Sequence, residues 1–250
     1  MAFYEYALQE RIRALLRLED LFRCLDRDLA DPGELRGILR SYLEILDFCQ
    51  RPELRMDLLL ELDQIHQNLQ HWSRSSQTDS QALQQWDERI LAQQQKLRKQ
   101  AQSFGESLRH QEILQLARGR QAVAGGLTRT DLPLLRFFEQ QAPKIRSDQF
   151  VRWRRELDTL EESTQLILTF LRESLDARVE HAEGGRFSMP LDPRHSVSLL
   201  RLELADDLDA YPKISGGIHR LHIQFLCWID PGPSRAVESS FPFRLALSAC

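Results

Sequence analysis

Residues 211–225, Tyr-Pro-Lys-Ile-Ser-Gly-Gly-Ile-His-Arg-Leu-His-Ile-Gln-Phe, carry the pattern that decides the C-terminal fold. Pro212 and the pair Gly216 and Gly217 punctuate the stretch, and the remaining residues alternate as in a half-buried strand. The pattern predicts a turn that places Arg220 at the start of a strand. Because the stretch has neither a nucleophile with its base nor a phosphate-binding loop, it indicates a docking surface.

Two further segments, 200–204 and 241–247, alternate between apolar and other residues in the same way. Three strands of similar length predict an antiparallel sheet with one face covered. Such a sheet needs a helix or a partner to bury its apolar face. Whether residues 184–191 add a fourth strand stays open.

Before residue 184 the apolar side chains recur at three- and four-residue steps, which is typical of amphipathic helices. The predicted helices cover 7–29, 34–49, 52–72, about 83–97, 107–122, a short helix capped by Asp131, and one long helix from about 147 to 179. Turns or loops are expected at 31–33, at 73–80 and at Gly125 and Gly126. The predicted fold class is therefore α+β, with a mostly helical domain at 1–182 and a small antiparallel β domain at 183–250.

The composition of the 250 residues is ordinary for a soluble globular protein, with 42% hydrophobic and 28% charged residues. A formal net charge of −4 gives no general attraction to nucleic acid or to an anionic membrane. Only four of the 33 basic residues are lysines, so 29 are arginines (33 − 4). Arginine suits forked recognition of carboxylates, although coding bias explains the total more simply.

Motifs for catalysis or metal binding are not evident. His219 and His222 are three residues apart in a predicted strand, so their side chains point to opposite faces and cannot share an ion. No metal spacing relates the cysteines, and we expect reduced thiols at Cys24, Cys49, Cys227 and Cys250. The N-terminus lacks a secretory pattern, and no stretch approaches 18 uncharged apolar residues. The sequence therefore predicts a cytoplasmic protein with no cofactor, no metal and no membrane contact.

Individual arginines are more suggestive than their total. Two of these arginines share a helix face, and others lie next to turns. The candidates for partner binding are Arg13, Arg17, Arg51, Arg118, Arg136 and Arg220. Each alone is most simply a solvated charge, but together they would form a cationic groove for an acidic peptide. Arg152, Arg154 and Arg155 are expected on the exposed side of the long helix.

Two other functions remain as alternatives. One is an arginine-rich nucleic-acid-binding protein, against which the acidic net charge and the lack of aromatic–basic interleaving argue. The other is an enzyme with a site between the two domains, which no motif supports.

Several short motifs, in order along nearly the full length, resemble those of the ZapD family. They are Leu-Arg-Leu-Glu at 16–19, Glu-Leu-Arg-x-Asp-Leu-Leu-x-Glu-Leu-Asp at 53–63, Gly125-Gly126 followed by Asp131-Leu-Pro, Leu-Leu-Arg-Leu at 199–202 and Tyr-Pro-x-Ile-Ser-Gly at 211–216. ZapD proteins are bacterial cytoplasmic proteins that bind and bundle filaments of the tubulin-like division GTPase FtsZ.

The resemblance implies a non-enzymatic homodimer at the midcell division site that holds the C-terminal tail of FtsZ in a positively charged pocket. Positions that match this pocket are Arg13, Arg17, Arg51 and Arg220, and Arg136 stands where a family member carries histidine. Two positions depart from the pattern: Gln224 replaces an expected arginine, and Glu112 occupies a basic position. Arg109 and Arg118 are the candidates to restore the missing charge.

Overall fold

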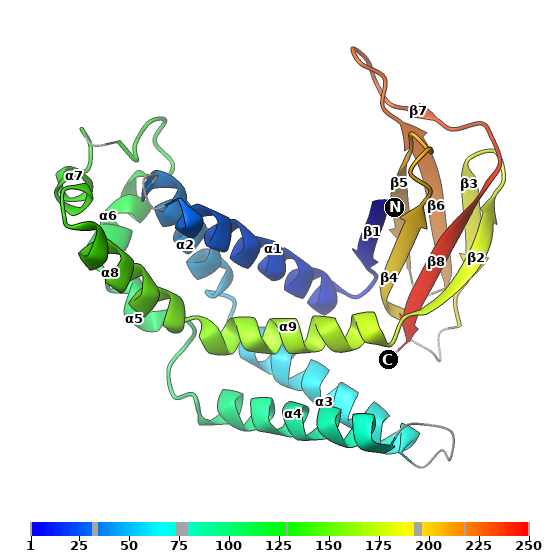
Figure 1. Cartoon of the computed structure of the whole chain (residues 1–250), viewed down its shortest axis with the longest axis horizontal. Coiled ribbons are helices and arrows are strands. Elements are labelled where there is room, and N and C mark those ends of the chain that lie inside the picture. Colours follow the sequence, from blue (N-terminus) through cyan, green and yellow to red (C-terminus); the bar gives the residue numbers. More distant parts are fainter. Residues whose placement is uncertain are drawn as a thin grey trace. The chain divides into compact units, whose positions relative to one another are not determined.

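The computed structural model describes residues 2–31, 35–73, 80–128, 130–192, 197–217 and 219–249 (Figure 1). Its contacts divide the chain into two compact units, residues 1–16 with 168–250, and residues 17–167. The predicted turn at 32–33, most of the predicted loop at 73–80, and Cys250 lie outside the described residues. The predicted α+β class is confirmed.

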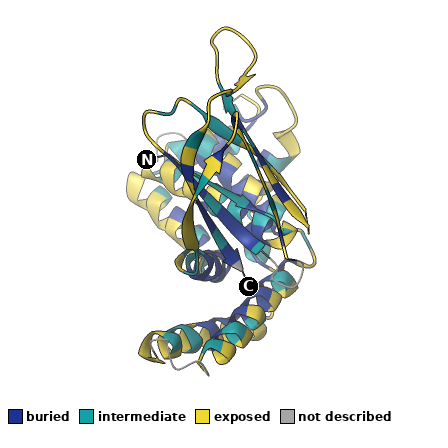
Figure 2. Ribbon diagram, turned by 90° about the vertical axis from the view of Figure 1, so that its right-hand side faces the viewer, coloured by how far each residue is buried: buried dark blue, intermediate teal, exposed yellow. Residues whose placement is uncertain are grey.

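Helices form the unit of residues 17–167. The predicted helices at 34–49, 52–72 and 83–97 are confirmed as α2 (Leu35–Phe48), α3 (Leu54–Trp72) and α4 (Ser80–Lys99). Figure 2 shows such helices two-toned, with buried residues along one side and exposed residues along the other. Since the apolar side chains recur once per turn, each helix buries one stripe.

The core of this unit contains a packed aromatic cluster. The ring of Tyr42 meets Trp153 edge-on at 5.4 Å between centroids, and Phe150 meets the same indole at 5.8 Å. The Tyr42 hydroxyl donates a hydrogen bond to the Phe150 carbonyl at 3.2 Å. This bond satisfies the polar end of a fully buried side chain, so the tyrosine can fill the core without an orphaned hydroxyl.

The predicted helix at 107–122 is wrong, because the structure has two short helices there. They are α5 (Glu106–Arg109) and α6 (Glu112–Arg120). A tight turn separates them, in which the Gln111 amide donates to the Leu108 carbonyl at 3.0 Å. Leu108 of α5 and Leu114 of α6 are both buried. The spacing of apolar residues therefore does not distinguish one continuous helix from two short helices.

The sequence predicted that Asp131 caps the following helix, and this prediction is wrong. Leu132 is the N-terminal flanking residue of α7 (Pro133–Glu139) and provides no side-chain cap. The Asp131 carboxylate instead accepts a hydrogen bond from the Thr128 hydroxyl at 3.0 Å. Proline occupies the first turn of α7, where its missing N–H has no intrahelical partner to lose.

The single long helix predicted from about 147 to 179 is also wrong. The structure has α8 (Pro143–Arg155), a break, α9 (Asp158–Glu173) and then the strand β2 (Asp176–Ala182). At the break, the Leu157 amide donates to the Arg154 carbonyl at 3.0 Å and the Leu157 side chain is fully buried. The tight turn keeps Leu157 in the core, so the break leaves the apolar periodicity undisturbed.

Arg154 is not on an exposed face, in contrast to the prediction for this helix. Its Nε lies 3.1 Å from Asp26 Oδ1, it pairs with Glu161, and its guanidinium covers the Phe22 ring at 5.0 Å. Burial alone would lower the pKa of Arg154, but the hydrogen bonds that Arg154 donates to Glu161 and Asp26 outweigh burial and hold this pKa above its ordinary value. The side chain therefore joins three helices of the core, α1 (Glu10–Ala30), α8 and α9.

Two antiparallel sheets form the other unit. The first has the order β1 (Ala2–Ala7), β4 (Val197–Leu204), β8 (Phe241–Ala249) and β2. The second has the order β3 (Arg186–Pro190), β6 (Arg220–Cys227) and β5 (Tyr211–Gly216), and β7 (Arg235–Ala236) pairs with the end of β6. The three predicted strands are confirmed, and the segment left open at 184–191 contains β3.

The prediction of one sheet is wrong, because the predicted strands divide between two. Leu202 and Leu245 of the first sheet share a buried cluster with Ile223 and Phe225 of the second. Each sheet therefore covers the apolar face of the other, as in a sandwich. Alternation of apolar residues along a strand indicates which face of the strand is buried. It does not indicate which strands pair with it.

The strands β1 and β2 belong to residues that the sequence assigned to the helical domain. In the structure they pair with β4 and β8 of the first sheet. The predicted domain boundary at 182/183 stays a prediction.

An ion cluster holds β1 on the sheet. Glu5 accepts hydrogen bonds from Arg172 of α9 and from Arg201 of β4, each at 2.7 Å. The Glu5 side chain is 11% exposed. Burial alone would raise its pKa, but the two arginines outweigh burial, so the pKa of Glu5 lies below its ordinary value of 4.5.

The substitution Glu5→Gln should lower the free energy of unfolding by roughly 1–3 kcal/mol at neutral pH, because it leaves two arginines without their shared carboxylate. A carboxylate with a lowered folded-state pKa contributes stability above its unfolded pKa, and this contribution is lost as the pH falls through the folded value. The difference between wild type and variant in urea denaturation should therefore shrink below pH 4.5. A difference that stays constant into acid would contradict this account.

Gly185→Ala should destabilise the protein by roughly 1–3 kcal/mol. Gly185 has a φ of +67°, and an added Cβ would lie 1.9 Å from the Val237 carbonyl oxygen. The matched control is Gly217→Ala, whose Cβ would meet no atom within 4 Å. Urea denaturation of both variants measures the difference, and equal stabilities would show that the close approach at Gly185 is unimportant.

Candidate functional site

Arg13 is fixed beside the end of β1. Its Nη2 donates to the Ala7 carbonyl at 3.1 Å, its Nη1 pairs with Glu10 Oε2 at 2.6 Å, and its guanidinium lies 5.5 Å from the centre of the Tyr6 ring. Arg17 follows one turn later on the same face of α1 and is exposed. The Arg13 guanidinium is thus held in place at the start of α1.

Arg220 is exposed at the start of β6, directly after the hairpin that the sequence predicted. The Gly217 amide donates to the Arg220 carbonyl at 3.1 Å and closes the turn. A Cβ on Gly216 would lie 2.4 Å from Leu8 Cδ2, so the hairpin packs closely on the segment between β1 and α1. This contact places the start of α1, with Arg13, beside the hairpin that carries Arg220.

Arg51 and Arg118 both contact residues near the C-terminal end of α2, within the helical unit. Arg118 forms an ion pair with Asp47. Arg51 pairs with Glu53 at 3.2 Å and covers the Phe48 ring at 5.4 Å. Both side chains are about one third exposed, so both remain accessible to a ligand.

Arg109 lies in the same neighbourhood but serves the fold. Its Nη2 donates to the carbonyls of Cys49 and Phe104, both at 3.1 Å, and its Nη1 donates to the Ser103 hydroxyl at 3.2 Å. Cys49 comes directly after α2, where carbonyls have no intrahelical partners. Arg109 is therefore occupied by the backbone, although the sequence made it a candidate to restore charge.

Arg136 lies on a different helix, α7, next to Phe137, which is 61% exposed. Across the described ranges, no ion pair involves the Arg136 side chain. Glu112, the other departure from the family pattern, is exposed at the first position of α6. The structure thus gathers Arg13 with the Arg220 hairpin in one unit and Arg51 with Arg118 in the other.

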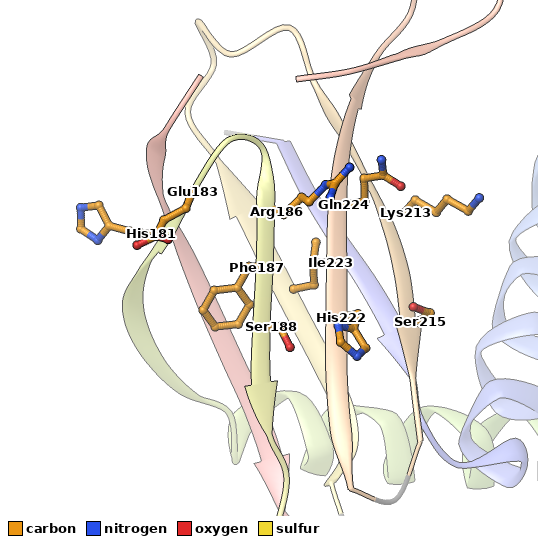
Figure 3. Close-up of a pocket in the computed structure, with 10 residues that line it drawn as sticks. All are labelled: His181, Glu183, Arg186, Phe187, Ser188, Lys213, Ser215, His222, Ile223 and Gln224. Carbon is orange, nitrogen blue, oxygen red and sulfur yellow. The ribbon is translucent and has the colours of Figure 1, made fainter. Parts of the chain in front are cut away.

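A polar hollow that the sequence did not predict lies on the outer face of the second sheet (Figure 3). Its volume is about 680 Å³, and its lining residues are His181, Glu183, Arg186, Phe187, Ser188, Lys213, Ser215, His222, Ile223 and Gln224. Alternation along β6 places His222 and Gln224 on one side of that strand, and the pairing of β5 with β6 brings in Lys213. The missing information was the pairing of β3 with β6, which brings in Arg186.

The described part of the chain offers little for catalysis or metal binding. It contains no group of three or more His, Cys, Asp or Glu side chains arranged to hold a metal ion. Burial raises the pKa of the Cys49 thiol to about 12, so this group stays protonated at neutral pH. Among the same residues, no helix combines the length and the apolar character that crossing a bilayer requires.

Fold and surface together define a class: an α+β protein with a helical unit and a β-sandwich unit that expose arginine-rich surfaces. The chain belongs to the ZapD family of cell division proteins, whose family model matches residues 16–224.

Curated relatives named cell division protein ZapD match over nearly the full length. The protein from Aromatoleum aromaticum is 30% identical over 97% of this chain and 95% of its own. The relative from Cupriavidus pinatubonensis is 32% identical over 99% of both chains. The relative from Nitrosomonas europaea is 31% identical over 97% of this chain and 93% of its own.

Replacement of Arg109 and of Arg118 should separate structural from surface arginines. Arg109→Ala should cost roughly 1–3 kcal/mol of unfolding free energy, because backbone carbonyls lose a charged donor. Arg118→Ala removes an exposed ion pair and should cost less than about 1 kcal/mol. Guanidinium denaturation of both variants gives the comparison, and a larger loss in Arg118→Ala would reverse the assignment.

Proposed function

We propose that this protein binds the C-terminal tail of FtsZ and, as a homodimer, cross-links FtsZ filaments into bundles that promote assembly of the division ring. The observation that carries the proposal is membership of the ZapD cell division family over nearly the whole chain. On this proposal the protein is not an enzyme and acts in the cytoplasm at midcell.

The arginines of the two units supply the contacts to the tail. They are Arg13, Arg17, Arg51, Arg118, Arg136 and Arg220. A guanidinium binds a carboxylate through two parallel hydrogen bonds, which suits an acidic peptide. Arg13 is already held by the Ala7 carbonyl and the Tyr6 ring, so binding loses little additional side-chain freedom there.

Cross-linking follows from two tail sites in one dimer. Each subunit holds one tail, and two tails from different filaments bring these filaments together. Many weak contacts along a pair of filaments then add up through effective concentration. Because the contacts are between exposed charges, bundling should weaken as the ionic strength rises.

Sedimentation of FtsZ polymers tests the proposal directly. The protein should co-pellet with intact FtsZ and bundle its filaments, whereas FtsZ without the C-terminal tail should pellet alone. Size-exclusion chromatography with multi-angle light scattering should give the mass of a dimer. Equal co-pelleting with tail-less FtsZ would reject the tail as the ligand, and a monomeric mass would reject the cross-linking mechanism.

Arg220→Glu should abolish measurable binding of a fluorescent FtsZ tail peptide, because it places a like charge against the acidic ligand. The side chain is exposed, so the variant should remain folded. Arg235→Glu is the matched control, since Arg235 is also exposed in the second sheet but pairs at the opposite end of β6. Fluorescence anisotropy measures both affinities, and unchanged binding by folded Arg220→Glu would remove this residue from the site.

A further inference from the structure

We propose that a small pocket between α1 and α8 of the helical unit binds an alkyl monocarboxylate, whose charge meets Arg155 and whose apolar chain covers Val151. The pocket has a volume of about 250 Å³ and is lined by Leu29, Ser147, Phe150, Val151, Arg154 and Arg155. None of these residues is a candidate for tail binding. The inference is therefore independent of the proposed function.

Three apolar side chains from two helices form the greasy part of the pocket. Phe150 is 4% exposed and belongs to the core, and Leu29 near the end of α1 is half-buried. Val151, the next residue of α8, is 47% exposed although its side chain lines the pocket. Because transfer of apolar surface out of water is favourable, an alkyl chain laid on Val151 gains free energy for both surfaces.

The charges that line the pocket favour an anion. Two arginines and no carboxylate are among its lining residues. Arg154 is already neutralised, since its Nε lies 3.1 Å from Asp26 Oδ1 and it also pairs with Glu161. Arg155 is exposed, and it forms no ion pair with any described residue of the helical unit. Arg155 is therefore the cation that a ligand carboxylate meets.

The positions along α8 set the direction of the ligand. Ser147, Val151 and Arg155 recur at four-residue steps, so they follow one side of the helix. Eight residues of helix span roughly 12 Å. A carboxylate at Arg155 thus places the chain over Val151, with its end toward Ser147.

The size of the pocket excludes a peptide and fits a short chain. Pockets for drug-sized ligands begin at about 300 Å³, so this pocket of about 250 Å³ takes a smaller molecule. Octanoate, with about ten non-hydrogen atoms, is of this size and combines one carboxylate with one alkyl chain. Octanoate is therefore the probe.

The location is tested by saturation-transfer NMR of octanoate with the full-length protein. Wild type should transfer saturation to the octanoate methylenes. Val151→Trp should abolish the transfer because the larger side chain fills the pocket, and the exposure of Val151 lets the variant fold. Val179→Trp is the matched control, since Val179 of β2 is 63% exposed outside the pocket, and it should bind as wild type does.

The charge is tested by comparing octanoate with 1-octanol, which has the same chain and no carboxylate. Arg155→Gln should weaken octanoate binding roughly three- to fivefold and leave 1-octanol binding within about twofold. Arg152→Gln is the matched control, because Arg152 is exposed on the same helix but does not line the pocket. This variant should leave both affinities within about twofold.

The apolar contact is tested by chain length. Butanoate keeps the carboxylate and lacks half of the chain, so it should bind at least roughly tenfold more weakly than octanoate. Circular dichroism of each variant checks that the fold is kept.

Three results would overturn the inference. They are the absence of saturation transfer from wild type to octanoate, unchanged octanoate binding by folded Val151→Trp, and equal affinity of wild type for octanoate and 1-octanol. Each of them leaves co-sedimentation with FtsZ unaffected, so failure of this pocket and failure of the proposed function are distinguishable.

Discussion

Pairing of β1 with β4, a strand far away in the sequence, is the constraint on which the sandwich unit depends. Glu5 of β1 and Arg201 of β4 are 196 residues apart in sequence and are joined by an ion pair at 2.7 Å. The chain then leaves β1 through Leu8, which packs on Gly216, and enters α1. The position of Arg13 relative to the Arg220 hairpin is thus a consequence of how β1 is anchored.

The arginines of this protein divide into those that hold the fold and those that extend from it. Arg109 binds backbone carbonyls, Arg154 joins three helices, and Arg172 clamps β1. Arg220 and Arg186, by contrast, are exposed on a sheet whose other face is buried. An arginine within the fold already binds carbonyls or carboxylates of the protein. Only the exposed arginines therefore have a charge available to bind a partner.

Local pattern was sufficient to predict several elements. The helices at α2 to α4 and the strands β4, β6 and β8 follow from the spacing of their apolar residues, because burial of one face imposes a period of 3.6 or 2. The break at Leu157 was not predictable in this way, since it keeps the same residues in the core. Pairing of β1 with β4 was missed because long-range register leaves no periodic signal within a segment as short as Ala2–Ala7.

The sequence predicted the residues of the candidate site but not their arrangement. The sequence provided the basic residues and, through its resemblance to a family, their expected ligand. Whether an arginine binds backbone carbonyls or an exposed carboxylate depends on tertiary neighbours, as the contrast between Arg109 and Arg118 shows. The row of Arg186, Gln224 and Lys213 depends on strand order, which alternation does not encode.

The most direct measurement is backbone amide hydrogen exchange of the full-length protein, with and without the FtsZ tail peptide. The account predicts slower exchange in the β5–β6 hairpin around Arg220 and at the start of α1 around Arg13. It also predicts slower exchange just after α2, in the segment that contains Arg51, and little change at β7. Protection confined to surfaces without these arginines would contradict the claim that they form the tail-binding site.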